Sequence, residues 1–313
     1  MRILLRYTVK RLLLLIPILL LVSLFAFGLV RLMPGSAEMA YLQAAGIPPS
    51  ETALQSASEE LGLDRPVYVQ YFDWLLKAVR LDFGNSFINK KEVRAELMGA
   101  LKNTMQLAGC ATLIILVISI PMGVLSAVRA NKELDYMNRV LAFLGSSMPS
   151  FWLGPLLVQV FCLKLGWFPV QGMGTWRNLV LPAFTMAVLY IATYSRSLRN
   201  SLLENMNQRF VMYSRARGIS ERKIVTNHVL RTSLIPAVTT FGVNFGHMMA
   251  GTAVVEILFS WPGLGRLCVS SVGSRDFPMI QGYIVLMALI FILVNLVTDL
   301  ITVMLDPRMR ESL

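Results

Sequence analysis

The chain alternates long apolar runs with shorter polar segments, and this pattern predicts helices that cross a membrane. A run of roughly 18 or more apolar residues can span a bilayer as a helix, and several such runs are present. Six spans are predicted, at residues 12–30, 104–128, 140–165, 179–195, 234–259 and 279–304. The expected fold is therefore an all-α integral membrane protein with six transmembrane helices.

The first apolar run has an alternative interpretation as a secretory signal peptide, because four basic residues precede it. The run is long, however, and no small-x-small cleavage site follows it cleanly. These two features favour a retained first span over a signal peptide.

The pattern divides the chain into four regions. Residues 1–32 form an N-terminal tail and the first span, and residues 102–304 form a core with the other five spans. Residues 33–101 are the only long polar region, predicted as a mostly helical insert with an amphipathic helix at 71–77. Residues 305–313 form a short tail.

The charge distribution predicts the orientation. The net charge of +11 would suit a nucleic-acid partner, but only 15% of the residues are charged, against about 25% in soluble domains. Basic residues concentrate before the first span, at 129–139, at 196–231 and at 308–310. The positive-inside rule then places both termini and the segment 196–233 in the cytoplasm and the insert 33–101 outside. The charge is a topology signal, so nucleic-acid binding is discarded.

Chemistry-bearing motifs are scarce. Cys110, Cys162 and Cys268 have neither a disulfide framework nor zinc spacing. The chain has no phosphate-binding loop of the G-x-x-x-x-G-K-[ST] kind, no H-E-x-x-H and no G-x-S-x-G. The chain is therefore not predicted to be an enzyme, and if ATP drives it, another chain binds the nucleotide.

The basic segment 196–233 has the pattern of a helix, a glycine turn and a second helix. Gly218 suits the left-handed position that ends a helix, and Ser220 suits the N-cap of the next, with Glu221 in its first turn. Ile219 and Ile224 have the spacing of a hydrophobic staple. The pattern indicates a firm knob, although an ordinary basic loop that holds two spans in register fits it about equally well.

The fifth span carries a polar face. Thr240, Asn244, His247 and Gly251 fall on one side of a helix, and Met248 borders that side. An ionisable group near the middle of a span tends to face a cavity or pathway, and imidazole and thioether are plausible transient nickel ligands. The alternative is that His247 hydrogen-bonds to a neighbouring span and the methionines fill core gaps. Close helix packing is the expected role of the G-x-x-x-G pair in this span, Gly242 and Gly246.

Several motifs together resemble the permeases of ABC importers, in the branch that carries peptides and nickel. Arg215-Ala216-Arg217-Gly218 and the later Leu234-Ile235-Pro236 are similar to that family's cytoplasmic coupling loop. The stretch from Glu256 through Phe259-Ser-Trp-Pro-Gly-Leu-Gly265 resembles its most specific signature. Segments 62–70, 81–86 and 275–278 resemble the family as well, so the resemblance covers nearly the whole chain.

The resemblance implies a type I ABC importer permease fold in the bacterial inner membrane. It implies a homologous second permease subunit, two ATP-binding subunits that carry ATP and Mg, and a periplasmic solute-binding protein; this chain itself binds no cofactor. Coupling to the ATPase is then assigned to Arg215, Ala216, Arg217, Gly218, Ile219, Ser220 and Glu221. Glu256 and Trp261 become candidates for an outer gate, with a structural cap as the alternative for Glu256.

The predicted cargo is nickel, free or chelated, and the alternative is a dipeptide or oligopeptide. His247-Met248-Met249 departs from the small and aliphatic residues usual in related peptide permeases, which favours a transient metal site at His247 and Met248. A stand-alone secondary transporter is a rival, but no clear repeat of broken helices supports it. A membrane enzyme lacks a catalytic constellation.

Overall fold

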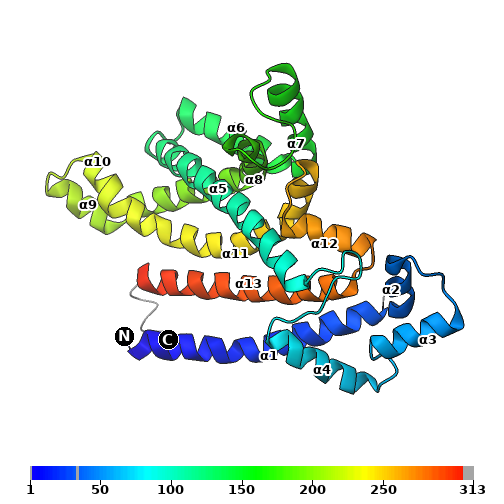
Figure 1. The fold of residues 1–313 in the computed structure, drawn as a ribbon. Coiled ribbons are helices and arrows are strands. Elements are labelled where there is room, and N and C mark those ends of the chain that lie inside the picture. The colour runs from blue at the N-terminus through cyan, green and yellow to red at the C-terminus, as the bar shows by residue number, and fades with distance from the viewer. Residues whose placement is uncertain (1, 33–34, 306–313) are drawn as a thin grey trace. The chain divides into compact units, whose positions relative to one another are not determined.

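The computed structural model describes residues 2–32 and 35–305, with side-chain surroundings for all of these except residues 2–12, 239, 243, 250, 251 and 305. Every element assigned there is a helix (Figure 1). The chain forms two compact units, one with residues up to 104 and 262–293, the other with residues 105–261 and from 294 onward. Of the predicted tail 305–313, only Leu305 lies within the described residues, as the last residue of α13.

The first unit contains the polar insert. Its elements are α1 (Arg2–Leu32), α2 (Ala37–Ala45), α3 (Glu51–Glu60), α4 (Val67–Val79), the first turns of α5 (Val93–Val128), α12 (Leu264–Gly273) and the first part of α13 (Phe277–Leu305). The Ser36 and Ser50 hydroxyls cap α2 and α3 by accepting main-chain hydrogen bonds of 3.3 and 3.2 Å. α5 begins at Val93 and not at 104, because its first turns are polar and lie outside the apolar pattern.

Aromatic side chains hold α4 against α1. The Phe27 ring centroid lies 5.3 Å from that of Tyr71 and 5.9 Å from that of Trp74. The Ser23 and Tyr71 hydroxyls are 2.9 Å apart and share a hydrogen bond. The amphipathic helix predicted at 71–77 is confirmed as part of α4, and its aromatic side is what packs on the first span.

A buried carboxylate ties the insert to the start of α13. Asp276 is 3% exposed and accepts hydrogen bonds from the Ser86 hydroxyl and from the main-chain NH of Phe87, at 3.0 Å for the latter. Around it, Phe87 packs with Val30 and Phe277 in a small core that joins α1, the insert and α13. The motif segments 81–86 and 275–278, far apart in sequence, therefore meet in the fold.

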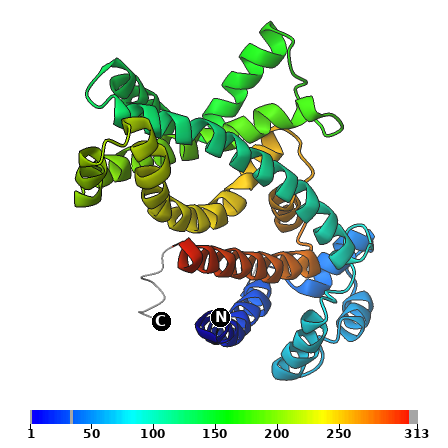
Figure 2. The same cartoon turned by 90° about the vertical axis from the view of Figure 1, so that its left-hand side faces the viewer.

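The second unit is a bundle of long helices. Its elements are the rest of α5, α6 (Glu133–Ser147), α7 (Ser150–Leu157), η1 (Val158–Lys164), α8 (Trp176–Met206), α9 (Arg209–Ala216), α10 (Glu221–Lys223), η2 (Ile224–Val229), α11 (Leu230–Leu258) and the end of α13. α8 is the central element, because it packs against α6, α7 and α11. Figure 2 shows α11 as a curved helix, yellow to gold.

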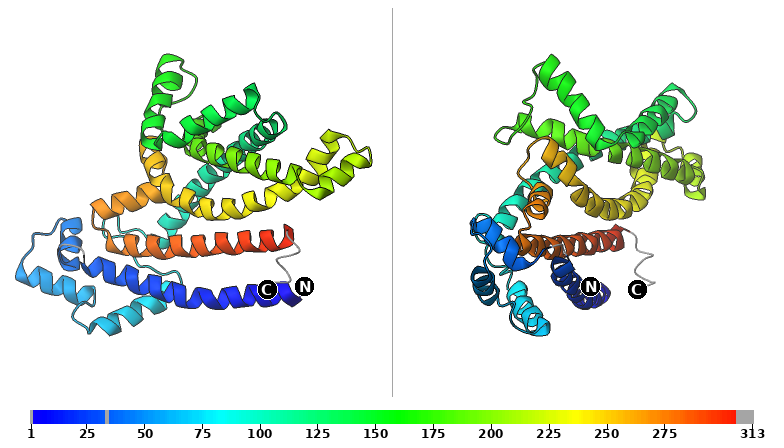
Figure 3. Two further views of the ribbon diagram at one scale, coloured as in Figure 1. Left: turned by 180° about the vertical axis from the view of Figure 1, so that it is seen from behind. Right: turned by 90° about the vertical axis from the view of Figure 1, so that its right-hand side faces the viewer.

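Four of the described helices are long and apolar enough to cross a membrane, namely α1, α5, α8 and α13, and two bent pairs raise the number to six if each pair is one span. One pair corresponds to the predicted span 140–165. It is broken into α6 and the helix formed by α7 and η1, which meet at 105° (Figure 3). Met148 is extended because it precedes Pro149, and a residue before proline is disfavoured in the helical region.

Candidate coupling segment and translocation face

The basic segment folds as the predicted helix, glycine turn and helix. Gly218 follows α9 with φ +74°, the left-handed conformation. The main-chain NH of Gly218 donates to the carbonyl of Arg215 at 2.9 Å, and the NH of Ile219 donates to the carbonyl of Ser214 at 3.2 Å. This pair of bonds is the Schellman motif, which satisfies the last carbonyls of the helix. The predicted conformation of Gly218 is therefore confirmed.

The predicted side-chain cap at Ser220 is wrong in detail. Ser220 occupies the N-cap position, but its hydroxyl makes no capping hydrogen bond. The turn is closed instead by an ion pair, in which Arg215 Nε and Nη2 donate to the two oxygens of Glu221 at 2.6 and 3.2 Å. This pairing with Glu221 raises the pKa of Arg215. A two-pronged contact of this kind fixes geometry as well as charge.

The turn stands on a hydrophobic base. Ile224 is 1% exposed and packs with Leu198 and Leu202 of α8 and Ala127 of α5, and the half-buried Ile219 joins the same cluster. Ile219 and Ile224 thus meet as the staple spacing predicts. The knob is the exposed surface above this base: Arg215, Ala216, Arg217, Gly218, Ser220 and Glu221. It is a stiff, basic projection of the bundle.

A buried carboxylate that the sequence analysis missed lies beside this base. Asp135 is 0% exposed and accepts hydrogen bonds from Arg199 Nε and Nη2 at 2.5 and 2.8 Å. It also accepts from Arg139 Nη2 at 2.7 Å, the Ser126 hydroxyl at 2.5 Å and the Asn131 NH at 2.8 Å. The cluster fastens the ends of α5, α6 and α8 together. The sequence offered one signal for this cluster: Asp135 lies four residues before Arg139, the spacing of an ion pair on a helix.

The residues predicted to share one face of the fifth span differ in their exposure to solvent. His247 is exposed on the chain, and Asn244 and Thr240 are half-buried, with the Thr240 hydroxyl donating to the Pro236 carbonyl at 2.9 Å. Met248 is 2% exposed and lines a small cavity with residues of α7 and α8. Gly251 lies in α11, but its surroundings are outside the described set. The side chains of His247 and Met248 thus have different environments.

Close packing explains one glycine of the G-x-x-x-G pair. A Cβ atom on Gly242 would lie 2.1 Å from the side chain of Thr298 on α13. That distance is far below any real contact, so only glycine lets the two helices approach this closely. The predicted packing role of Gly242 is confirmed.

The outer-gate candidates Glu256 and Trp261 lie at the end of α11. Both are buried, at 0% and 1% exposed, and the Trp261 NH donates to the Glu256 carbonyl at 2.7 Å. Ser260 between them has φ +53°. The main chain here makes a second Schellman turn, with serine in the position that glycine usually takes.

His247 belongs to no metal-binding cluster in the part of the chain that the structure describes. Among the described residues, no group of three or more histidine, cysteine, aspartate or glutamate side chains is placed to hold a metal ion.

Comparison with known proteins decides the family. Residues 119–311 match the family described as binding-protein-dependent transport system inner membrane component, and residues 4–108 match its N-terminal membrane component. The chain belongs to this family. As a binding-protein-dependent transport permease, it is an integral inner-membrane subunit of an ABC importer and not itself an enzyme, because separate subunits hydrolyse ATP. A partner permease, ATP-binding subunits and a binding protein follow from this membership.

Individual relatives refine the picture. The permease is 37% identical over 306 residues to the glutathione transport system permease protein GsiC of Escherichia coli, covering 98% of this chain and 99% of the relative. The GsiC protein of Shigella flexneri serotype 5b gives the same figures. A solved inward-facing MetNI methionine ABC transporter is 19% identical, with a TM-score of 0.57 over 67% of this chain and 96% of that chain. The predicted all-α importer permease fold is confirmed.

Proposed function

We propose that this permease carries short peptides of the glutathione type across the inner membrane. The observation that carries the proposal is the 37% identity to the glutathione permeases along nearly the full length of both chains. This favours the peptide alternative of the sequence analysis over nickel. The test is uptake of labelled glutathione and of a labelled dipeptide by cells that express the complete transporter. Uptake of nickel with neither peptide transported would overturn the proposal.

The knob is proposed as the contact with the ATP-binding subunits. Its support is geometric: exposed cations stand on a turn fixed by Gly218, by the Arg215–Glu221 ion pair and by the buried base at Ile224. Closure of the ATPase pair would then push on a rigid projection and move the bundle as a body.

Replacement of Gly218 by valine tests this coupling role. The substitution strains the left-handed turn, so we expect loss of cargo-stimulated ATP hydrolysis and weaker co-purification of the ATPase. Arg177→Ala is the control and should change neither, because Arg177 is exposed in the first turn of α8, at the end predicted to face the other side of the membrane. Full coupling in Gly218→Val would remove the knob from the mechanism.

The exposed His247 and the half-buried Asn244 and Thr240 are proposed to line the path of the cargo. Replacement of His247 by alanine should lower peptide uptake with the complex intact. The transient metal site at His247 and Met248 has a separate test, because Met248→Leu should lower nickel uptake only if the thioether contacts the ion. The gate role of Glu256 and Trp261 predicts that Glu256→Gln uncouples ATP hydrolysis from cargo.

The orientation is also a proposal. Both termini and the knob are assigned to the cytoplasm, and the insert 33–101 to the outside, from the positive-inside rule. A single cysteine at Lys91 should react with a membrane-impermeant maleimide in intact cells, and one at Lys223 only after permeabilisation. The three native cysteines are replaced beforehand. The reverse labelling pattern would invert the topology.

A further inference from the structure

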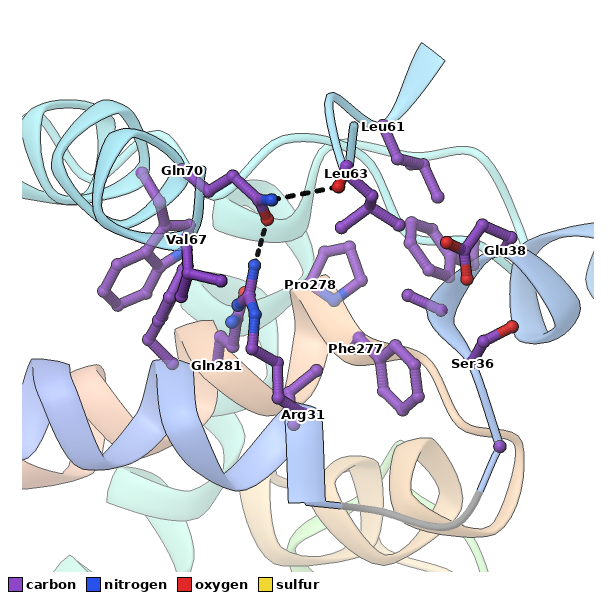
Figure 4. Close-up of a pocket in the computed structure, with 16 residues that line it drawn as sticks. Arg31, Ser36, Glu38, Leu61, Leu63, Val67, Gln70, Phe277, Pro278 and Gln281 are labelled. Carbon is purple, nitrogen blue, oxygen red and sulfur yellow. Dashed lines mark hydrogen bonds between the residues drawn. The ribbon is translucent and has the colours of Figure 1, made fainter. Parts of the chain in front are cut away.

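A cavity of about 420 Å³ lies within the first unit, apart from every residue assigned above to coupling or to the cargo path. Figure 4 shows it between the C-terminal end of α1, the start of α2, the first turns of α4 and the first turn of α13. A volume of this size suits a small organic molecule.

One side of the cavity carries a fixed cation. The Arg31 guanidinium lies 3.9 Å from the ring centroid of Phe27 and donates a hydrogen bond to the side-chain oxygen of Gln70. The Gln70 amide nitrogen in turn donates to the carbonyls of Leu63 at 3.2 Å and Arg65 at 2.6 Å, so its position is set by the main chain. A guanidinium has five N–H donors, and most of those of Arg31 remain available to an anion.

The opposite side carries an anion. Glu38, half-buried in the first turn of α2, directs its carboxylate toward the middle of the cavity, across from Arg31 (Figure 4). The rest of the wall is mostly apolar and includes the aromatic rings of Phe27, Trp74, Phe87 and Phe277.

Figure 4 shows a further polar side chain, Gln281, beside Arg31. Gln281 is 9% exposed and lines the cavity, and its side-chain amide makes no hydrogen bond to any residue that the structure describes. The Gln281 amide is not among the fully enclosed polar atoms that lack a partner, so water in the open cavity reaches it. A bound molecule with its own hydrogen-bonding group can take the place of that water on Gln281.

We propose that this cavity binds a small zwitterion, with its carboxylate or phosphate against Arg31 and Gln281 and its ammonium group against Glu38. The opposed charges select a molecule with both signs, and the aromatic wall accepts a short apolar body. A short peptide and the ethanolamine headgroup of a phospholipid share this chemistry. This proposal can be tested separately from the proposed cargo, because ligand binding to the cavity is measured without nucleotide and without transport.

The experiment is titration calorimetry on the purified full chain, with any co-purifying subunits, in a neutral maltoside detergent. The probes are alanyl-alanine, its N-acetyl and C-amide derivatives, and glycerophosphoethanolamine. The variants are Arg31→Gln and Glu38→Gln. The matched controls are Arg80→Gln, an exposed arginine at the end of α4, and Glu51→Gln, an exposed glutamate in the first turn of α3. Gln281→Met is a further variant that leaves both charges in place.

We expect alanyl-alanine to bind, and Arg31→Gln and Glu38→Gln each to weaken binding roughly 10- to 150-fold, the effect of losing a hydrogen bond to a charged group. Gln281→Met should weaken binding less, and the two controls should not change it. Glycerophosphoethanolamine binding with the same variant pattern, and no peptide binding, would assign the site to a lipid headgroup. Binding of neither probe, equal binding of the blocked derivatives, or binding unchanged in Arg31→Gln and Glu38→Gln would overturn the proposal.

Discussion

The strongest stability prediction concerns Asp135. Its carboxylate is 0% exposed and accepts two hydrogen bonds from Arg199, whose side chain is only 13% exposed. Replacement by asparagine keeps the shape but leaves the Arg199 guanidinium buried without a counter-ion. Loss of one partner from a buried ion pair costs about 3 to 5 kcal/mol. The Arg139 side chain is 43% exposed, so Arg139→Gln should cost less than about 1 kcal/mol.

The assay is the free energy of unfolding of the purified chain in detergent, followed by circular dichroism during chemical denaturation. Glu133→Gln is the matched control, because Glu133 shares the first turn of α6 with Asp135 but is exposed. We expect Asp135→Asn to be the most destabilising change and Arg199→Gln to exceed Arg139→Gln. A free energy of unfolding for Asp135→Asn within about 1 kcal/mol of that of the unaltered protein would show that the Asp135 cluster does not hold α5, α6 and α8 together.

The other predictions use the same chain. Gly242→Ala should destabilise the protein by about 1 to 3 kcal/mol, because the added Cβ meets Thr298, whereas Gly109→Ala, with no atom within 4 Å of the added Cβ, should be neutral or stabilising in thermal unfolding. Ser260→Gly should raise stability by about 0.5 to 1 kcal/mol, since φ there is +53°; a lower unfolding midpoint would refute this. Asp276→Ala should free the insert, and limited proteolysis should then cleave it earlier than in the unaltered protein.

Features that depend on neighbouring residues could be predicted from the sequence. The long apolar runs identified the membrane helices, since hydropathy alone decides them. The turn at Gly218 was predictable because glycine, the staple pair Ile219 and Ile224, and the acidic first turn at Glu221 all lie within a few positions. Each of these patterns lies within a few neighbouring positions, so it can be recognised in the sequence without knowledge of the fold.

Contacts between distant residues could not be predicted in this way. Nothing near Asp276 identifies Ser86 as its partner, and nothing near Gly242 identifies Thr298. The break at Met148 was hidden because apolar residues flank it on both sides, so hydropathy favours one continuous span. His247 is exposed and the adjacent Met248 is buried because of which side of α11 packs on α8. Periodicity groups residues on one face of a helix, but it does not identify the helix that packs against that face.

A knob can transmit force only if its base moves with the helices that it drives. α8 supplies Leu198 and Leu202 to the base under Ile224, and it also supplies Arg199 to the Asp135 cluster on α6. The same helix packs along α11, which carries His247. A push on the knob therefore acts first on α8, and through α8 on the ion-paired α6 and on the helix proposed to face the cargo. Substitutions at Leu202 should accordingly uncouple ATP hydrolysis from transport as effectively as substitutions on the knob itself, although Leu202 is fully buried within this chain.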